Sequence, residues 1–190
     1  MNGIGPAAVS SADFLVPPSA VRASSVCNAE KQFMADLQCE DDVGLVLRGH
    51  LHIEHELIAL ASVPLPFAER CDWVRIGYRA KVEFAYGCGM PDDLKNLLER
   101  LGSIRNGFAH TLNVSLSKQS VLDLYNSLSD RIRDGLKVSY RAMGLGELAG
   151  PSSLETRDLL ILIFLTARQA TKAAVLALEA ERADSGITTR

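Results

Sequence analysis

The sequence predicts an all-α protein, a single-domain bundle of about five to six helices. Apolar residues recur at intervals of three and four along most of the chain, as on the buried face of a helix. No run of alternating β-branched residues indicates a strand, and glycine and proline separate the helical blocks. The 190 residues are 47% hydrophobic and 23% charged, which is typical of a globular domain that buries its own core.

The ends of the chain are predicted to be flexible, so that the bundle covers residues 27–183. The leader, 1–26, is rich in Ala, Ser and Pro and lacks the segments of a secretory signal, and 184–190 forms a tail. The apolar run Leu159–Leu165 is too short to span a bilayer. The four cysteines show neither a CxxC pair nor a zinc-site spacing, which favours a reducing compartment. We therefore expect a cytoplasmic protein without a membrane contact.

The individual helices are predicted from their apolar period and their end signals. Asp41 and Asp42 suit the positive end of the second helix, and Gly87–Gly89 ends the third. The last helix starts at a capping box, Ser152-x-x-Glu155, and its high hydrophobicity predicts a central position or a dimer interface. The expected helices are 27–37, 41–61, 67–86, one from 91 that the segment 105–110 closes, 118–143 and 152–182. The expected apolar faces are Trp73, Ile76, Ala80 and Phe84 on the third helix and Leu94, Leu97, Leu98, Leu101, Ile104 and Phe108 on the fourth.

The main candidate site is the segment RNGFAH, which closes the fourth helix. An arginine fork holds a phosphate through two contacts, and a histidine that titrates near neutral pH donates or accepts a proton. Asn106 would orient either the histidine or a 2′-hydroxyl group. Arg105, Asn106 and His110 together are thus the types of group that cleavage of a phosphodiester requires.

Helix geometry restricts how this segment can act. Arg105 and His110 are about 140° apart on an ideal helix, so one phosphate meets both only if Gly107 distorts the helix or two subunits share the site. A plainer interpretation is that Asn106-Gly107 ends the helix and His110 caps it. The net charge of −3 gives no general attraction for nucleic acid, so any contact depends on a local basic patch or a dimer cleft.

A second cluster lies in the second helix, where three histidines lack the i, i+4 spacing of a metal site, so no metal is expected. His50 and Glu54 fall on the apolar face of this helix. The outer face carries Arg48, His52 and His55. A carboxylate on the core side must meet a cation or a donor from another helix, either to hold two helices in register or to support an active site. The candidate partners are Arg105, Lys81 and His110.

The third helix carries a basic run that is interleaved with acidic residues, which is typical of a solvated face. Arg75 and Arg79 are spaced as helix neighbours and could extend a phosphate-binding surface. The run consists of Arg70, Arg75, Arg79 and Lys81, with Asp72 inside it and Glu83 just after it.

The Arg105-Asn106-x3-His110 motif resembles that of the HEPN domains, in which four to six residues separate an arginine from a histidine. The resemblance implies an up-and-down bundle that dimerises so that two motifs face each other. It also implies a metal-independent endoribonuclease without a cofactor, from a toxin–antitoxin or defence system. Arg105 would hold the scissile phosphate, His110 would transfer protons and Asn106 would position the 2′-hydroxyl. The supporting residues would be His50, Glu54 and Lys81.

A wider resemblance, over about residues 44–110, is to the mannitol-repressor-like family of small helical proteins. It rests on the segments RGHLHIEHEL, KVEFAYGCG and LLERLGSIRNGFAH, in that order. It implies a regulator of transcription that has no helix-turn-helix and acts through protein partners. Of the two resemblances, we take the one to the HEPN domains as the leading hypothesis, and we expect a homodimer that cleaves RNA. The alternatives are a non-enzymatic regulator that acts through protein partners, and a toxin-neutralising or scaffold subunit in which the motif is only structural. A partner protein would be an antitoxin or a regulatory protein.

Overall fold

The computed structural model describes residues 30–110 and 115–184, and every regular element in these ranges is helical. The predicted leader and almost all of the predicted tail lie outside the described residues, as does the start of the first predicted helix. The all-α bundle that the sequence predicts is confirmed. The described part contains seven α-helices, more than expected, because the predicted fifth helix is two helices.

The helices follow one another through short connections, and most of their bounds lie within a few residues of the expected ones. The first described helix covers residues 30–38. The others are α2 (Asp42–Ser62), α3 (Tyr78–Gly87), α4 (Asp92–His110), α5 (Lys118–Asn126), α6 (Asp130–Ala142) and α7 (Thr156–Asp184). As the acidic pair indicates, Asp41 caps α2 by accepting a hydrogen bond from the Gly44 N–H at 2.7 Å.

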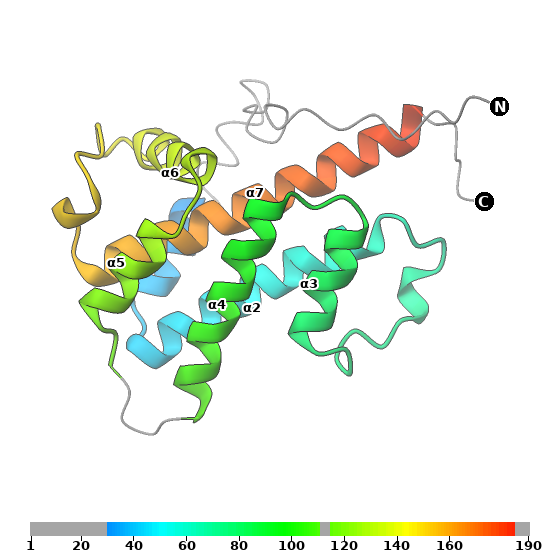
Figure 1. Ribbon diagram of the computed structural model, residues 1–190, viewed down its shortest axis with the longest axis horizontal. Helices are drawn as coiled ribbons and strands as arrows, with labels where there is room; N and C mark the ends of the chain where they lie inside the picture. Colours follow the sequence, from blue (N-terminus) through cyan, green and yellow to red (C-terminus); the bar gives the residue numbers. More distant parts are fainter. Residues whose placement is uncertain (1–29, 111–114, 185–190) are drawn as a thin grey trace.

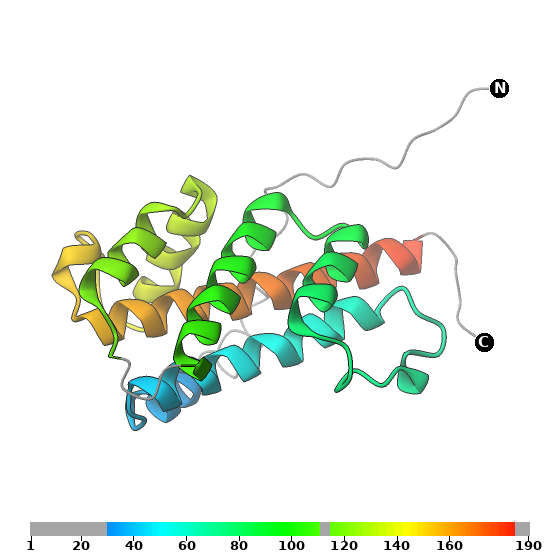
Figure 2. The same ribbon diagram turned by 60° about the horizontal axis from the view of Figure 1, so that its bottom comes forward.

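α7 is the central helix and packs against α2, α4, α5 and α6 (Figure 1). Its residues from Leu159 to Ala167 are all buried, which confirms the predicted central position. Figure 2 shows α2 running beside α7, with α4 crossing over both. Gly49 on α2 permits this close approach, because a Cβ atom there would lie 2.9 Å from the ring of Phe164. The α2–α7 pair is thus the base on which α3 and α4 lie.

By length and composition, α7 could also cross a membrane. The core helix of a bundle passes the same test, and 67% of the apolar stretch in α7 is buried inside the protein. The packing of α7 against four other helices accounts for its hydrophobicity.

The predicted helix at 67–86 is wrong in its first half. Ala68–Arg70 forms a short 3₁₀ turn, and α3 begins after Gly77, whose extended backbone separates the two. The predicted apolar face is therefore wrong as well, and Phe84 is 43% exposed. The residues of α3 that face the bundle are Tyr78, Lys81, Val82 and Ala85.

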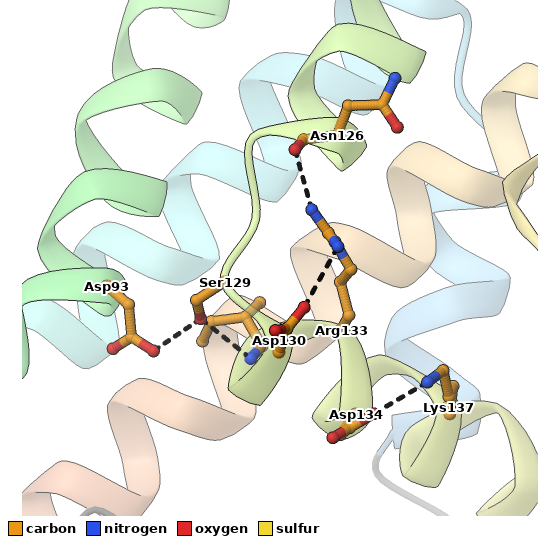
Figure 3. Close-up of polar contacts among 8 residues, drawn as sticks. Asp93, Asn126, Ser129, Asp130, Arg133, Asp134 and Lys137 are labelled. Atoms are coloured by element: carbon orange, nitrogen blue, oxygen red, sulfur yellow. Dashed lines mark hydrogen bonds and ion pairs between the residues drawn. The ribbon is translucent and has the colours of Figure 1, made fainter.

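The predicted helix at 118–143 is divided into α5 and α6 (Figure 3). Ser129 caps α6, because its Oγ accepts a hydrogen bond from the first turn of α6 at 3.2 Å and donates one to Asp93 on α4 at 2.7 Å. Arg133 donates to the carbonyl oxygen of Asn126 at 2.9 Å, across the corner between the two helices. A serine that satisfies a first-turn N–H group favours a new helix start over a continuous helix.

The predicted capping box at Ser152 and Glu155 is also wrong, because α7 begins at Thr156. Ser152 lies in a 3₁₀ turn, Pro151–Ser153. The preceding Gly150 has a φ of 159°, and the proline that follows it begins the short turn.

Candidate functional site at the junction of α2, α3 and α4

α4 carries the predicted motif in its last two turns. Its predicted apolar face is confirmed, since its leucines are buried, Phe108 is 9% exposed and Ile104 packs against the core. The helix continues through Gly107 to His110. The interpretation that Asn106-Gly107 ends the helix is therefore wrong, and Gly107 does not interrupt α4. The backbone of His110 belongs to α4, and its side chain lies outside the described part.

Arg105 is partly buried and the adjacent Asn106 is exposed. Arg105 Nη1 donates a hydrogen bond to Asn106 Oδ1 at 3.1 Å, which joins two of the predicted site residues. Within residues 30–110 and 115–184, no carboxylate forms an ion pair with Arg105. Its guanidinium therefore keeps an uncompensated charge and several N–H donors, which are the features that bind a phosphate.

Glu54 meets a cation from another helix, as the sequence predicts. Lys81 Nζ on α3 donates to Glu54 Oε1 on α2. The side chain of Lys81 is 3% exposed and that of Glu54 is 22% exposed. Lys81 is thus the partner of Glu54 in the described structure, and Arg105 is not. Because a buried ammonium group without a counter-charge is costly, this ion pair fixes α3 on α2.

His50 is 2% exposed on α2, as its position on the apolar face predicts. Its ring lies 4.2 Å from the ring of Tyr78, centroid to centroid. Neither ring nitrogen has a hydrogen-bond partner in the described part of the chain. Burial lowers the pKa of His50 to about 4; Glu54 opposes this shift, and the charges of Arg105 and Lys81 lower the pKa further. The imidazole is therefore neutral at neutral pH.

Tyr78 is the residue of this junction that the sequence did not reveal. Its hydroxyl donates to the carbonyl oxygen of Leu98 on α4 at 2.9 Å, and burial raises its pKa. Its ring covers Gly102, where a Cβ atom would lie 2.7 Å from a ring carbon. The sequence indicates that Tyr78 points inward once the start of α3 is placed after Gly77, since Tyr78 then shares one face of the helix with the buried residues that follow it.

The junction combines groups from three helices around His50. α2 contributes His50 and Glu54, α3 contributes Tyr78 and Lys81, and α4 contributes Arg105, which is close enough to shift the pKa of His50. Glu54 pairs with Lys81, Arg105 has no carboxylate partner among the described residues, and the imidazole beside them is neutral. Buried groups with perturbed pKa values and incomplete partners are characteristic of functional sites.

The outer face of α2 takes no part in the junction. Arg48 pairs with Glu40 at 2.8 Å, and His55 is exposed. His52 is partly buried, and its ring contacts the edge of Phe33 at 4.9 Å between centroids. Among the described residues, no group of three or more His, Cys, Asp or Glu side chains is placed to hold a metal ion.

Comparison with known proteins gives no match to a family model, to a curated protein or to a solved structure. The class that the coordinates define is therefore an all-α helical bundle with a polar three-helix junction. The resemblances to the HEPN domains and to the mannitol-repressor-like proteins stay predictions.

Proposed function

We propose that this chain is a HEPN-type endoribonuclease that works without a metal or a cofactor, as a homodimer in a toxin or defence system. The observation that carries the proposal is Arg105, a partly exposed arginine that is hydrogen-bonded to Asn106 and has no carboxylate partner in the described structure. A guanidinium in that condition is prepared to bind a phosphate, whereas a structural arginine is normally paired.

Each residue of the motif has one role in this reaction. Arg105 holds the scissile phosphate, and Asn106 positions the 2′-hydroxyl. His110 takes the proton of the 2′-hydroxyl as its oxygen attacks phosphorus, and then gives this proton to the departing 5′-oxygen, so that the histidine ends in its starting state. The products are a 2′,3′-cyclic phosphate and a free 5′-hydroxyl. His50 is neutral and lacks contact with solvent, so it supports the junction rather than transferring protons.

The undivided α4 is the reason for proposing two subunits. Because Gly107 does not interrupt the helix, positions 105 and 110 keep the separation of about 140° that a regular helix imposes. A single copy then presents the arginine and the histidine in different directions. A second copy, with its α4 across a shared cleft, supplies the complementary group to each phosphate.

The test uses a single-stranded RNA in the presence of a chelator. The wild type should cleave it to products with a cyclic phosphate and slow growth when expressed, while Arg105→Ala and His110→Ala should abolish both effects. Since Arg105 makes no ion pair in the described structure, the free energy of unfolding of the Arg105→Ala protein should lie within about 0.5 kcal/mol of the wild-type value. Unchanged cleavage by His110→Ala would exclude the catalytic role.

A second candidate function, a non-enzymatic regulator that acts through a protein partner, is favoured by one observation. Exposed apolar side chains gather in α3 and the segment before it: Phe67, Val74, Phe84 and Tyr86. A regulator or toxin-neutralising subunit should form a complex of fixed stoichiometry with a partner encoded nearby. That complex should be lost with Val74→Asp and kept with Arg105→Ala, the reverse of what the nuclease requires.

A further inference from the structure

Contacts at both ends of α3 fix how this helix lies along α4. At the end of α3, Lys95 Nζ on α4 bonds to Glu83 Oε2 at 2.9 Å and lies 4.2 Å from the centre of the Tyr86 ring. At the start of α3, Tyr78 bonds to Leu98 and covers Gly102. The two helices therefore run antiparallel, and the start of α3 lies against the middle of α4, just before the motif (Figure 1).

Helix periodicity places Arg79 and Asn106, the residue next to Arg105, on facing stripes of α3 and α4. Arg79 shares a stripe of α3 with Glu83 and Tyr86, because these lie four and seven residues further on. Asn106 shares a stripe of α4 with Lys95, eleven residues before it. Since Lys95 contacts both Glu83 and Tyr86, the two stripes face each other along the line between the helices.

The charges along these stripes suit an anion. Arg79 is exposed, and no carboxylate of the described residues pairs with it. The first turn of α3 has no acidic residue to neutralise the positive end of the helix. Glu99 lies one turn of α4 beyond Lys95, opposite the start of α3, and is close enough to raise the pKa of Tyr78, so it opposes anion binding at this point. Glu99 thus partly offsets the positive charge at the start of α3.

We propose that Arg79 forms a second phosphate subsite, which holds the RNA phosphate next to the one that Arg105 holds. The subsite rests on the proposed function and adds to it a preference for substrates with more than one phosphate. Glu99 limits the affinity of the stripes, so that RNA is released after cleavage. The ligand is single-stranded RNA, because a flexible backbone can follow a line of separate cations.

Binding is measured with the His110→Ala protein, so that cleavage does not interfere, and with a fluorescent single-stranded RNA of about ten nucleotides at several salt concentrations. Adding Arg79→Gln should weaken binding roughly five- to tenfold and reduce the salt slope by about 0.7, the loss of one phosphate contact. Adding Glu99→Gln should strengthen binding. Lys137→Gln, a matched loss of one charge on α6, should change nothing.

A cleavage assay separates this inference from the proposed function. In the otherwise native protein, Arg79→Gln should slow cleavage of the longer RNA and leave cleavage of a dinucleotide, which has one phosphate between its nucleosides, unchanged. Equal affinity and salt slope for the Arg79→Gln and parent proteins would overturn the second subsite while the nuclease proposal stands. Absence of any cleavage, with binding still dependent on Arg79, would overturn the nuclease proposal alone.

Discussion

α2 carries two buried polar clusters on opposite sides, and they differ in how completely their charges are paired. On the side of α7, Glu56 and Glu30 face Arg168 and Lys172, with nitrogen–oxygen distances between 3.1 and 3.8 Å. Two carboxylates meet two cations, and each carboxylate contacts both of them. This network closes on itself and joins residues 30–38 to α2 and α7.

On the side of α3 and α4 the pairing is incomplete. Glu54 and Lys81 form one ion pair, and Arg105 and the imidazole of His50 are left over in the described structure. A closed network holds helices together and offers nothing to a ligand. An open one keeps charge and hydrogen-bonding capacity that a bound phosphate can use. The comparison therefore indicates a structural role for the first cluster and leaves the second as the candidate site.

The largest effect is expected from breaking the closed network. Arg168→Ala should lower the free energy of unfolding by about 4 kcal/mol, because it leaves Glu30 and Glu56 buried with one half-exposed lysine between them. It also removes the guanidinium that lies 4.9 Å from the Phe33 ring centre. Urea denaturation measures the change, with Arg168→Lys as the control that keeps the charge. A loss below about 1 kcal/mol would show that the network is not a structural element.

A smaller loss is expected from breaking the one ion pair of the junction. Glu54→Ala should cost about 3 kcal/mol, because Lys81 then lies buried without a counter-charge. The double variant Glu54→Ala/Lys81→Met should recover most of that stability, since it removes the unpaired charge as well. A melting temperature equal to that of the wild type in Glu54→Ala would contradict the pairing.

The smallest effect concerns the pH dependence that His50 contributes. Its pKa is about 4 in the folded protein and near the usual 6.5 in the unfolded chain, so the unfolded chain binds the proton first as the pH falls. The folded state should therefore lose about 2 kcal/mol relative to the unfolded chain on going from neutral pH to about pH 5.

His50→Phe keeps a ring against Tyr78 and removes the titration. The difference in unfolding free energy between this variant and the wild type should grow as the pH is lowered from 7 to 5. Above pH 7 this difference should no longer depend on pH. Glu54, Lys81, Tyr78 and Arg105 face His50 in both proteins, so their contributions largely cancel in the comparison. If the stability curves of the variant and the wild type run parallel over this pH range, the pKa of His50 is the same in the folded and the unfolded protein.

Sequence patterns predicted well what depends on one helix alone. The leucine face of α4, the inward position of His50 and the need of Glu54 for a cation all follow from helical period and from the cost of burying a charge. The sequence predicts the start of α3 about ten residues too early, because the basic and apolar residues before Gly77 have a spacing that is also typical of a helix. That error concealed Tyr78, which becomes visible as an inward residue only when the helix starts at the right place.

The sequence by itself determined that this chain is an all-α bundle, that α7 is buried and that Arg105 and His110 lie on one helix. These features depend on local periodicity and on the hydrophobic effect, which act on neighbouring residues. The tertiary structure decided that Lys81 pairs with Glu54, that Tyr78 covers Gly102 and that Arg105 has no carboxylate partner in the described part. Such pairings depend on which helices meet and in what register, and the period of a single helix does not contain that information.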